Sequence, residues 1–191
     1  MIPAEPAPPP ADLLFVFAGA PWRKRAALDA WRGGAARALV LSVGRFEWRR
    51  LPELGIADDG GLAALVEATP PERRHFLLVL EEGRAAARLV PKGRLGTWSE
   101  ALALASLARE RGAGSIEVCT SGYHMPRALL SVRRAIGRTV RGGAGPLLRP
   151  LPVAEPDGST LASDRVARSP RAWRALGVEL VKRIGYLLAA R

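Results

Sequence analysis

The chain has 191 residues, which is enough for one domain and short for two. Its apolar share of 48% is that of a globular chain with a buried core, so disorder is excluded for most of its length. The 29 Lys and Arg residues against 18 Asp and Glu give a net charge of +11, which favours nucleic acid, anionic lipid or phosphorylated small molecules as partners. Charge is the only support for nucleic acid, because no nucleic-acid motif is recognisable, and we do not expect direct nucleic-acid binding.

The numbers of cysteines and histidines and the lengths of the apolar runs argue against a disulfide-bonded, a metal-binding or a membrane-spanning protein. The single cysteine, Cys119, rules out an intramolecular disulfide and a cysteine metal cage, and two histidines far apart in the sequence give no metal-site pattern. No segment approaches the ~20 apolar residues that span a bilayer. The first apolar run, Leu13 to Ala20, is too short for a signal peptide and has no basic segment before it. We therefore expect a soluble, cytoplasmic protein without a metal or a transmembrane segment; the sequence does not indicate its oligomeric state.

The first third of the chain predicts an arm followed by a strand–helix–strand unit. Five prolines crowd into residues 2–11 and favour extended backbone, so we expect a disordered arm over residues 1–11 and a single domain over residues 12–191. The domain opens with a buried strand from Asp12 to Gly19, a helix from Trp22 to Arg32 and a second buried strand from Arg37 to Ser42. Such a unit implies parallel strands with a right-handed crossover.

The remaining elements continue the alternation of helix and strand. A short helix is expected over Leu62 to Ala68, then a strand over Phe76 to Leu80 that returns over Ala85 to Val90 around Glu82 and Gly83. After these we predict a helix over Thr97 to Arg111, a strand over Ser115 to Thr120, a helix from Pro126 to Ile136, a short strand at Leu147 and Leu148, and an amphipathic helix over Arg171 to Ala190. The pattern is that of an α/β protein with a mainly parallel sheet.

The segment from Cys119 to Arg127 carries the strongest functional signal. In open parallel sheets, ligands bind beyond the carboxyl ends of the strands, and this segment leaves a strand and enters a helix, whose start attracts carboxylate or phosphate. Ser121 offers a hydroxyl, Tyr123 a ring, and His124 a donor or proton carrier. Arg127 offers a planar fork for an anion.

Each of these residues also has a structural interpretation. A Thr-Ser pair before a helix is commonly a cap, an Arg in a first turn is commonly solvated, and Thr97-x-x-Glu100 has the pattern of a capping box. His75 beside two arginines is expected to be a surface residue. Cys119 is expected to be a small core residue rather than a nucleophile.

The sequence resembles the YdcF/SanA/ElyC family of bacterial proteins of poorly defined function. The resemblance rests on Thr97-x-x-Glu100 before a helix, on Thr120-Ser-Gly-Tyr-His-Met-Pro-Arg-Ala128 after the next strand, and on an Arg-bearing first helix followed by Leu39-Val-Leu-Ser-Val-Gly44. It spans residues 12–190 and is weak between residues 50 and 90. The chain departs from the family pattern at Val43, Pro91, Gly96 and Ala101, and its first-strand glycines are reduced to Gly19, which Ala20 and Pro21 follow.

The resemblance implies a Rossmann-like three-layer αβα sandwich and a pocket built from residues of several strand ends, namely Arg25, Ser42, Thr97, Glu100, Ser121, His124 and Arg127. It also implies a role in envelope or cell-wall biogenesis and S-adenosylmethionine as a ligand.

Two functions follow as hypotheses. In the first, the chain binds an anionic or nucleotide-like small molecule, such as a phosphorylated or lipid-linked envelope precursor. If the chain is an enzyme, we expect His124 to carry the proton and Glu100 to be its carboxylate partner or a second acid or base. Arg127 and Arg25 would then bind the anion. In the second, the chain is a non-catalytic interaction protein whose basic face contacts an acidic partner or the membrane surface, with the terminal helix lying on anionic lipid.

Overall fold

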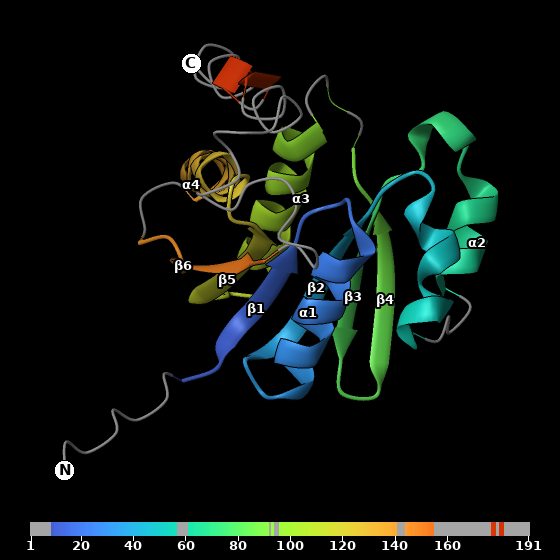
Figure 1. Ribbon diagram of the computed structural model, residues 1–191, viewed down its shortest axis with the longest axis horizontal. Helices are drawn as coiled ribbons and strands as arrows, with labels where there is room; N and C mark the ends of the chain where they lie inside the picture. Colours follow the sequence, from blue (N-terminus) through green and yellow to red (C-terminus); the bar gives the residue numbers. More distant parts are fainter. Residues whose placement is uncertain are drawn as a thin grey trace, which may run out of the picture.

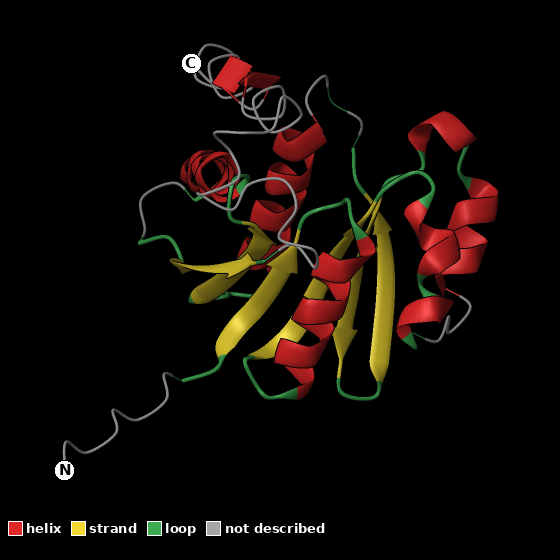
Figure 2. Ribbon diagram, in the orientation of Figure 1, coloured by secondary structure: helices red, strands yellow, loops and turns green. Residues whose placement is uncertain are grey.

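In the part of the chain that the structure describes, six β-strands form one sheet with helices on both of its faces (Figures 1 and 2). The computed structural model describes residues 9–56, 61–91, 93, 96–140, 144–154, 177–178 and 180–181. Within these residues the predicted fold class is confirmed: the protein is α/β, with the three layers of a Rossmann-like sandwich.

The elements alternate along most of the chain. The strands are β1 (Ala11–Val16), β2 (Ala36–Val43), β3 (Phe76–Glu81), β4 (Arg84–Leu89), β5 (Ser115–Ser121) and β6 (Leu147–Val153). The α-helices are α1 (Pro21–Arg32), α2 (Gly61–Ala68), α3 (Gly96–Glu110) and α4 (Met125–Thr139), and short 3-10 turns are η1 (Glu47–Arg50), η2 (Pro52–Leu54) and η3 (Pro71–Arg73).

The strand order is β4-β3-β2-β1-β5-β6. β1 pairs in parallel with β2 and β5, and β5 pairs in parallel with β6, so the predicted strand–helix–strand unit at the start of the chain is confirmed. β3 runs antiparallel to both β2 and β4, and it forms with β4 the predicted hairpin. The sheet is therefore mainly parallel, with an antiparallel pair of strands at one edge.

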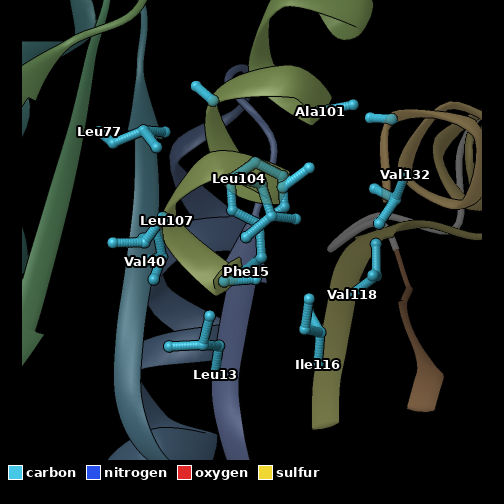
Figure 3. Close-up of a cluster of buried hydrophobic side chains, with 14 of the residues drawn as sticks. Leu13, Phe15, Val40, Leu77, Ala101, Leu104, Leu107, Ile116, Val118 and Val132 are labelled. Atoms are coloured by element: carbon cyan, nitrogen blue, oxygen red, sulfur yellow. The ribbon is translucent and has the colours of Figure 1, made fainter. Parts of the chain in front are cut away.

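Both faces of the central strands are buried, because alternate side chains point to opposite helix layers. Leu13 and Phe15 of β1 pack with Val40, Ile116 and Val118 under α3 and α4 (Figure 3). The intervening residues Leu14 and Val16 pack on the other face with α1 and α2. This double burial explains why the strands have near-continuous apolar sequences.

Two predicted segments lie outside the described residues. They are most of the N-terminal arm, residues 1–8, and nearly all of the terminal helix predicted over 171–190, where only 177–178 and 180–181 are described, as helix. None of the helices in the described part of the chain has both the length and the apolar character needed to cross a bilayer.

Candidate functional site

The carboxyl ends of β1, β2 and β5 meet at one edge of the sheet, and the start of the antiparallel strand β3 lies at the same edge, since Phe76 pairs with Val43. The helix that follows β1 covers one face of the sheet, whereas α3 and α4, which precede and follow β5, cover the other (Figure 1). Chain connections therefore diverge between β1 and β5, and this divergence is where open α/β sheets form a ligand-binding crevice.

We refer to this position between the ends of β1 and β5 as the crevice, and its β5 side consists of the last residues of β5 and the turn into α4. Thr120 and Ser121 are fully buried, and His124, which precedes α4, is 7% exposed. The Thr120 hydroxyl lies 2.9 Å from His124 Nδ1, and the His124 ring packs edge-to-face on Phe17. Ser121 Oγ is buried and has no hydrogen-bond partner within the described residues. These contacts fix the imidazole and leave the Ser121 hydroxyl with unused bonding capacity.

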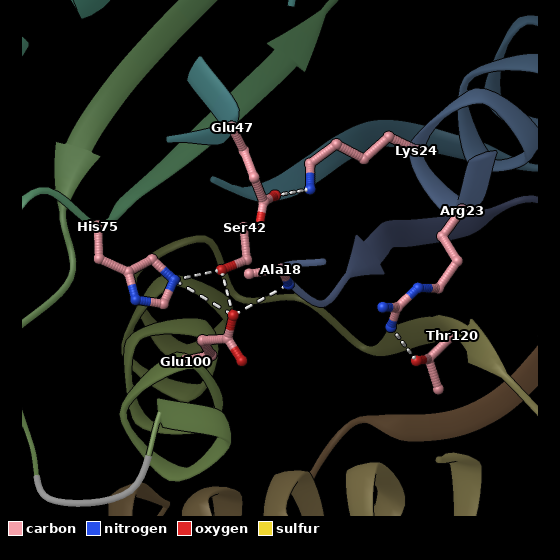
Figure 4. Close-up of polar contacts among 8 residues, drawn as sticks. All are labelled: Ala18, Arg23, Lys24, Ser42, Glu47, His75, Glu100 and Thr120. Atoms are coloured by element: carbon pink, nitrogen blue, oxygen red, sulfur yellow. Dashed lines mark hydrogen bonds and ion pairs between the residues drawn. The ribbon is translucent and has the colours of Figure 1, made fainter. Parts of the chain in front are cut away.

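Arg23 reaches this group from the opposite side. Its Nη1 donates a 3.0 Å hydrogen bond to Thr120 Oγ1, so a cation from α1 contacts the end of β5 (Figure 4). Gly19 makes this possible, because a Cβ at that position would overlap the Arg23 guanidinium, and because its φ of +136° lies where L-residues are strained. The glycine that ends the first apolar run thus gives Arg23 room to cross the turn.

Arg127 lies in the first turn of α4 and is only 8% exposed. Its Nη1 donates a 2.8 Å hydrogen bond to Thr97 Oγ1, which ties α4 to the start of α3. The expectation that an arginine here is solvated is therefore wrong. Tyr123, by contrast, is 36% exposed on the turn.

A second polar cluster lies beside the crevice and centres on Glu100, which is 4% exposed. Its Oε1 accepts hydrogen bonds from the Ala18 backbone N–H at 3.0 Å and from Ser42 Oγ at 2.6 Å, and lies 3.2 Å from His75 Nε2 (Figure 4). Ser42 Oγ is also 2.7 Å from His75 Nε2. One carboxylate oxygen thus connects α3 to the ends of β1 and β2 and to the start of β3.

We call the cluster of Ala18, Ser42, His75 and Glu100 the tie, because it joins α3 to the ends of β1 and β2 and to the start of β3. Its geometry differs from that of a catalytic triad. In a serine hydrolase the two ring nitrogens of the histidine contact different partners, the serine and the carboxylate. Here Ser42 and Glu100 both face the same nitrogen of His75, and the Ser42 hydroxyl donates to the carboxylate. At His124, the Nδ1 atom faces the Thr120 hydroxyl, whereas Glu100 contacts His75.

Lys24 and Glu47 form a buried ion pair on the α1 side of the same edge (Figure 4). Burial lowers the pKa of the Lys24 ammonium, and the attraction of Glu47 only partly offsets this effect. Gly44 allows the Glu47 side chain to fold back toward α1, since a Cβ there would lie 2.8 Å from Glu47 Oε1. The pair holds η1 against the start of α1.

The structure brings most of the predicted site residues to this edge but divides them between two clusters. Ser121, His124, Arg127 and Thr97 lie around the crevice, whereas Ser42 and Glu100 belong to the tie. Arg25 is exposed on α1. The cap interpretations are wrong: α3 begins at Gly96, which places Thr97 inside the helix, and α4 begins after His124 with no side-chain cap.

Three functional candidates were missed by the sequence analysis: Arg23, Lys24 and His75. The prediction that His75 is a surface residue is wrong, since its side chain is 25% exposed and contacts Ser42 and Glu100. Helical spacing could have found the other two, because Arg23 and Lys24 stand four residues before Ala27 and Leu28, which are buried.

Among the described residues, no group of three or more His, Cys, Asp or Glu side chains is placed to hold a metal ion. Burial raises the pKa of the Cys119 thiol to about 12, and the residue is fully buried under α1, so the prediction of a core cysteine is confirmed.

Comparisons with protein-family models, with curated proteins and with solved structures gave no match for this chain.

Proposed function

We propose that the chain binds a small anionic molecule in the crevice between the ends of β1 and β5. The observation that carries the proposal is Ser121, whose hydroxyl is buried and has no partner within the described residues. Burying a hydroxyl without a hydrogen bond costs about 1–3 kcal/mol. A ligand that bonds to Ser121 Oγ would remove this cost.

The charges around Ser121 favour an anion. Arg23 contacts Thr120, the residue before Ser121, and Arg127 lies in the first turn of α4, the helix that follows. α4 has 15 residues, no acidic residue in its first turn and no side-chain cap, so no carboxylate on the helix itself offsets the positive end of its dipole. Guanidinium groups and a helix start together suit phosphate or carboxylate.

His124 is the group of this crevice suited to proton transfer, because imidazole changes charge near neutral pH. Its ring is oriented by Thr120 and Phe17. Glu100 contacts His75, so we do not carry forward its pairing with His124 and assign it to holding the crevice in shape. The family resemblance would place such a ligand in envelope or cell-wall biogenesis.

A ligand panel monitored by thermal unfolding tests the proposal. The panel contains inorganic phosphate, pyrophosphate, S-adenosylmethionine and an uncharged sugar. A ligand at a hundred times its dissociation constant adds about 2.7 kcal/mol of stability. For a chain of this size the unfolding midpoint then rises by roughly 5–10 °C.

Arg127→Gln should abolish this rise, whereas Arg133→Gln should preserve it, because Arg133 is exposed on the same helix and its loss changes the net charge equally. A rise that survives Arg127→Gln, or that the uncharged sugar also produces, would refute the proposal.

A further inference from the structure

A cavity of about 390 Å³ lies between the start of α1 and the 3-10 turns that follow β2. It is lined by Gly19, Pro21, Lys24, Phe46, Glu47, Arg49, Arg50 and Leu54. Its volume is within the range of small-molecule sites. Apart from Gly19, these residues take no part in the crevice around Ser121.

The charge balance of the cavity favours an anion. Among the described residues that line it, Glu47 alone is acidic, and its carboxylate forms an ion pair with Lys24. Arg49 and Arg50 come at the end of η1, and neither makes an ion pair within the described residues. Two exposed arginines therefore line the cavity without a carboxylate partner among the described residues. Guanidinium forks match phosphate oxygens.

The same cavity presents an aromatic surface. Phe46 is 64% exposed, which is high for a phenylalanine, and it lines the cavity. The Arg45 guanidinium lies 5.0 Å from its ring centroid, and Arg49 lies 5.2 Å from the ring of Trp48. An exposed ring flanked by arginines is a platform on which a nucleobase stacks, with added cation–π attraction.

We propose that this cavity binds a nucleoside monophosphate, with the base against Phe46 and the phosphate between Arg49 and Arg50. A mononucleotide is favoured over a nucleic-acid strand because the ring and the two cations converge on one hollow of single-ligand size. The proposal uses residues that the anion crevice does not use, so either one can fail without the other.

Isothermal titration with AMP, ribose 5-phosphate, adenosine and a ten-residue oligoadenylate tests the proposal. Stacking of one base should make AMP bind roughly ten times more tightly than ribose 5-phosphate. Phe46→Ala should reduce AMP to the affinity of ribose 5-phosphate and leave ribose 5-phosphate unchanged. Arg49→Gln with Arg50→Gln should weaken both phosphates about tenfold or more, as expected for the loss of charge-assisted hydrogen bonds.

The control variant is Arg109→Gln with Arg133→Gln, which removes the same charge from exposed positions on α3 and α4 and should leave AMP binding unchanged. Arg127→Gln should also leave it unchanged, which separates this cavity from the crevice. Equal affinities for AMP and ribose 5-phosphate, or no binding of AMP, would overturn the proposal. So would an oligoadenylate that binds far more tightly than AMP with a steep salt dependence, because that result identifies a nucleic-acid surface.

Discussion

Replacing Ser121 by alanine should make the unliganded protein more stable. The Ser121 hydroxyl is 1% exposed at the end of β5 and bonds to nothing within the described residues. An unsatisfied buried hydroxyl costs about 1–3 kcal/mol. Ser121→Ala removes that cost and leaves a gap of one oxygen atom, so we expect the free energy of unfolding to rise by about 1 kcal/mol.

Ser131→Ala is the matched control. Ser131 is equally buried, on α4, but its hydroxyl donates a 2.9 Å hydrogen bond to the Arg127 carbonyl. Losing this bond should cost about 0.5–1.5 kcal/mol or be neutral. Urea unfolding followed by circular dichroism measures both differences, with each kcal/mol also moving the thermal midpoint by roughly 2–4 °C.

Stability and binding must move in opposite directions in Ser121→Ala if the hydroxyl is held for a ligand. We expect weaker binding of inorganic phosphate together with the gain in stability. A loss of stability comparable to or larger than that of Ser131→Ala would show that the Ser121 hydroxyl is bonded in the unliganded protein. That result would refute the reasoning behind the crevice.

Two further predictions concern the tie and the thiol. Glu100→Ala leaves the Ala18 N–H without a partner and removes the acceptor of the Ser42 hydroxyl, so urea unfolding should show a loss of about 2–4 kcal/mol. Glu110→Ala, on the same helix, removes only exposed bonds to Arg88 of β4 and Ser106 of α3 and should cost under about 1 kcal/mol. Equal losses would contradict the tie. Cys119, with a pKa of about 12 and full burial, should resist alkylation by iodoacetamide at pH 8 until urea unfolds the chain, and rapid labelling of the folded protein would contradict its placement.

The strands of the sheet could be predicted because a strand that is buried on both faces has a continuous apolar sequence. β1 and β2 have side chains packed on both faces, and two glycines follow the helix between them. The sequence therefore predicts both the type and the order of these three elements. β6 was underestimated, since Pro150 and Pro152 interrupt its run. Among the described strands, β6 lies at the edge of the sheet and pairs with β5 alone. Proline, which has no backbone N–H, is tolerated in an edge strand where that N–H would point away from the neighbouring strand.

The site was predicted less completely, for two geometric reasons. His75 comes immediately before a strand, whereas a search for ligand groups in parallel sheets looks immediately after strands. Because β3 is antiparallel, its start lies at the edge where β1 and β2 end. Arg23 and Arg25 are two residues apart, about 200° around a helix, so only one of them can face the sheet. The buried Ala27 marks the face of Arg23.

The two polar clusters at this edge differ in what they leave unsatisfied, and this difference separates support from binding. In the tie, one Glu100 carboxylate oxygen contacts the Ser42 hydroxyl, the Ala18 N–H and His75 Nε2, and a ligand would have to break existing bonds to enter. Around Ser121 a fully buried hydroxyl still has its bonding capacity. A binding site needs rigid groups that hold its shape and groups with free bonding capacity that contact the ligand. Here the tie, on the β2 side of β1, meets the first need, and Ser121, on the β5 side, meets the second. A substitution in the tie should therefore disturb binding only through a loss of stability, whereas Ser121→Ala should weaken binding without such a loss.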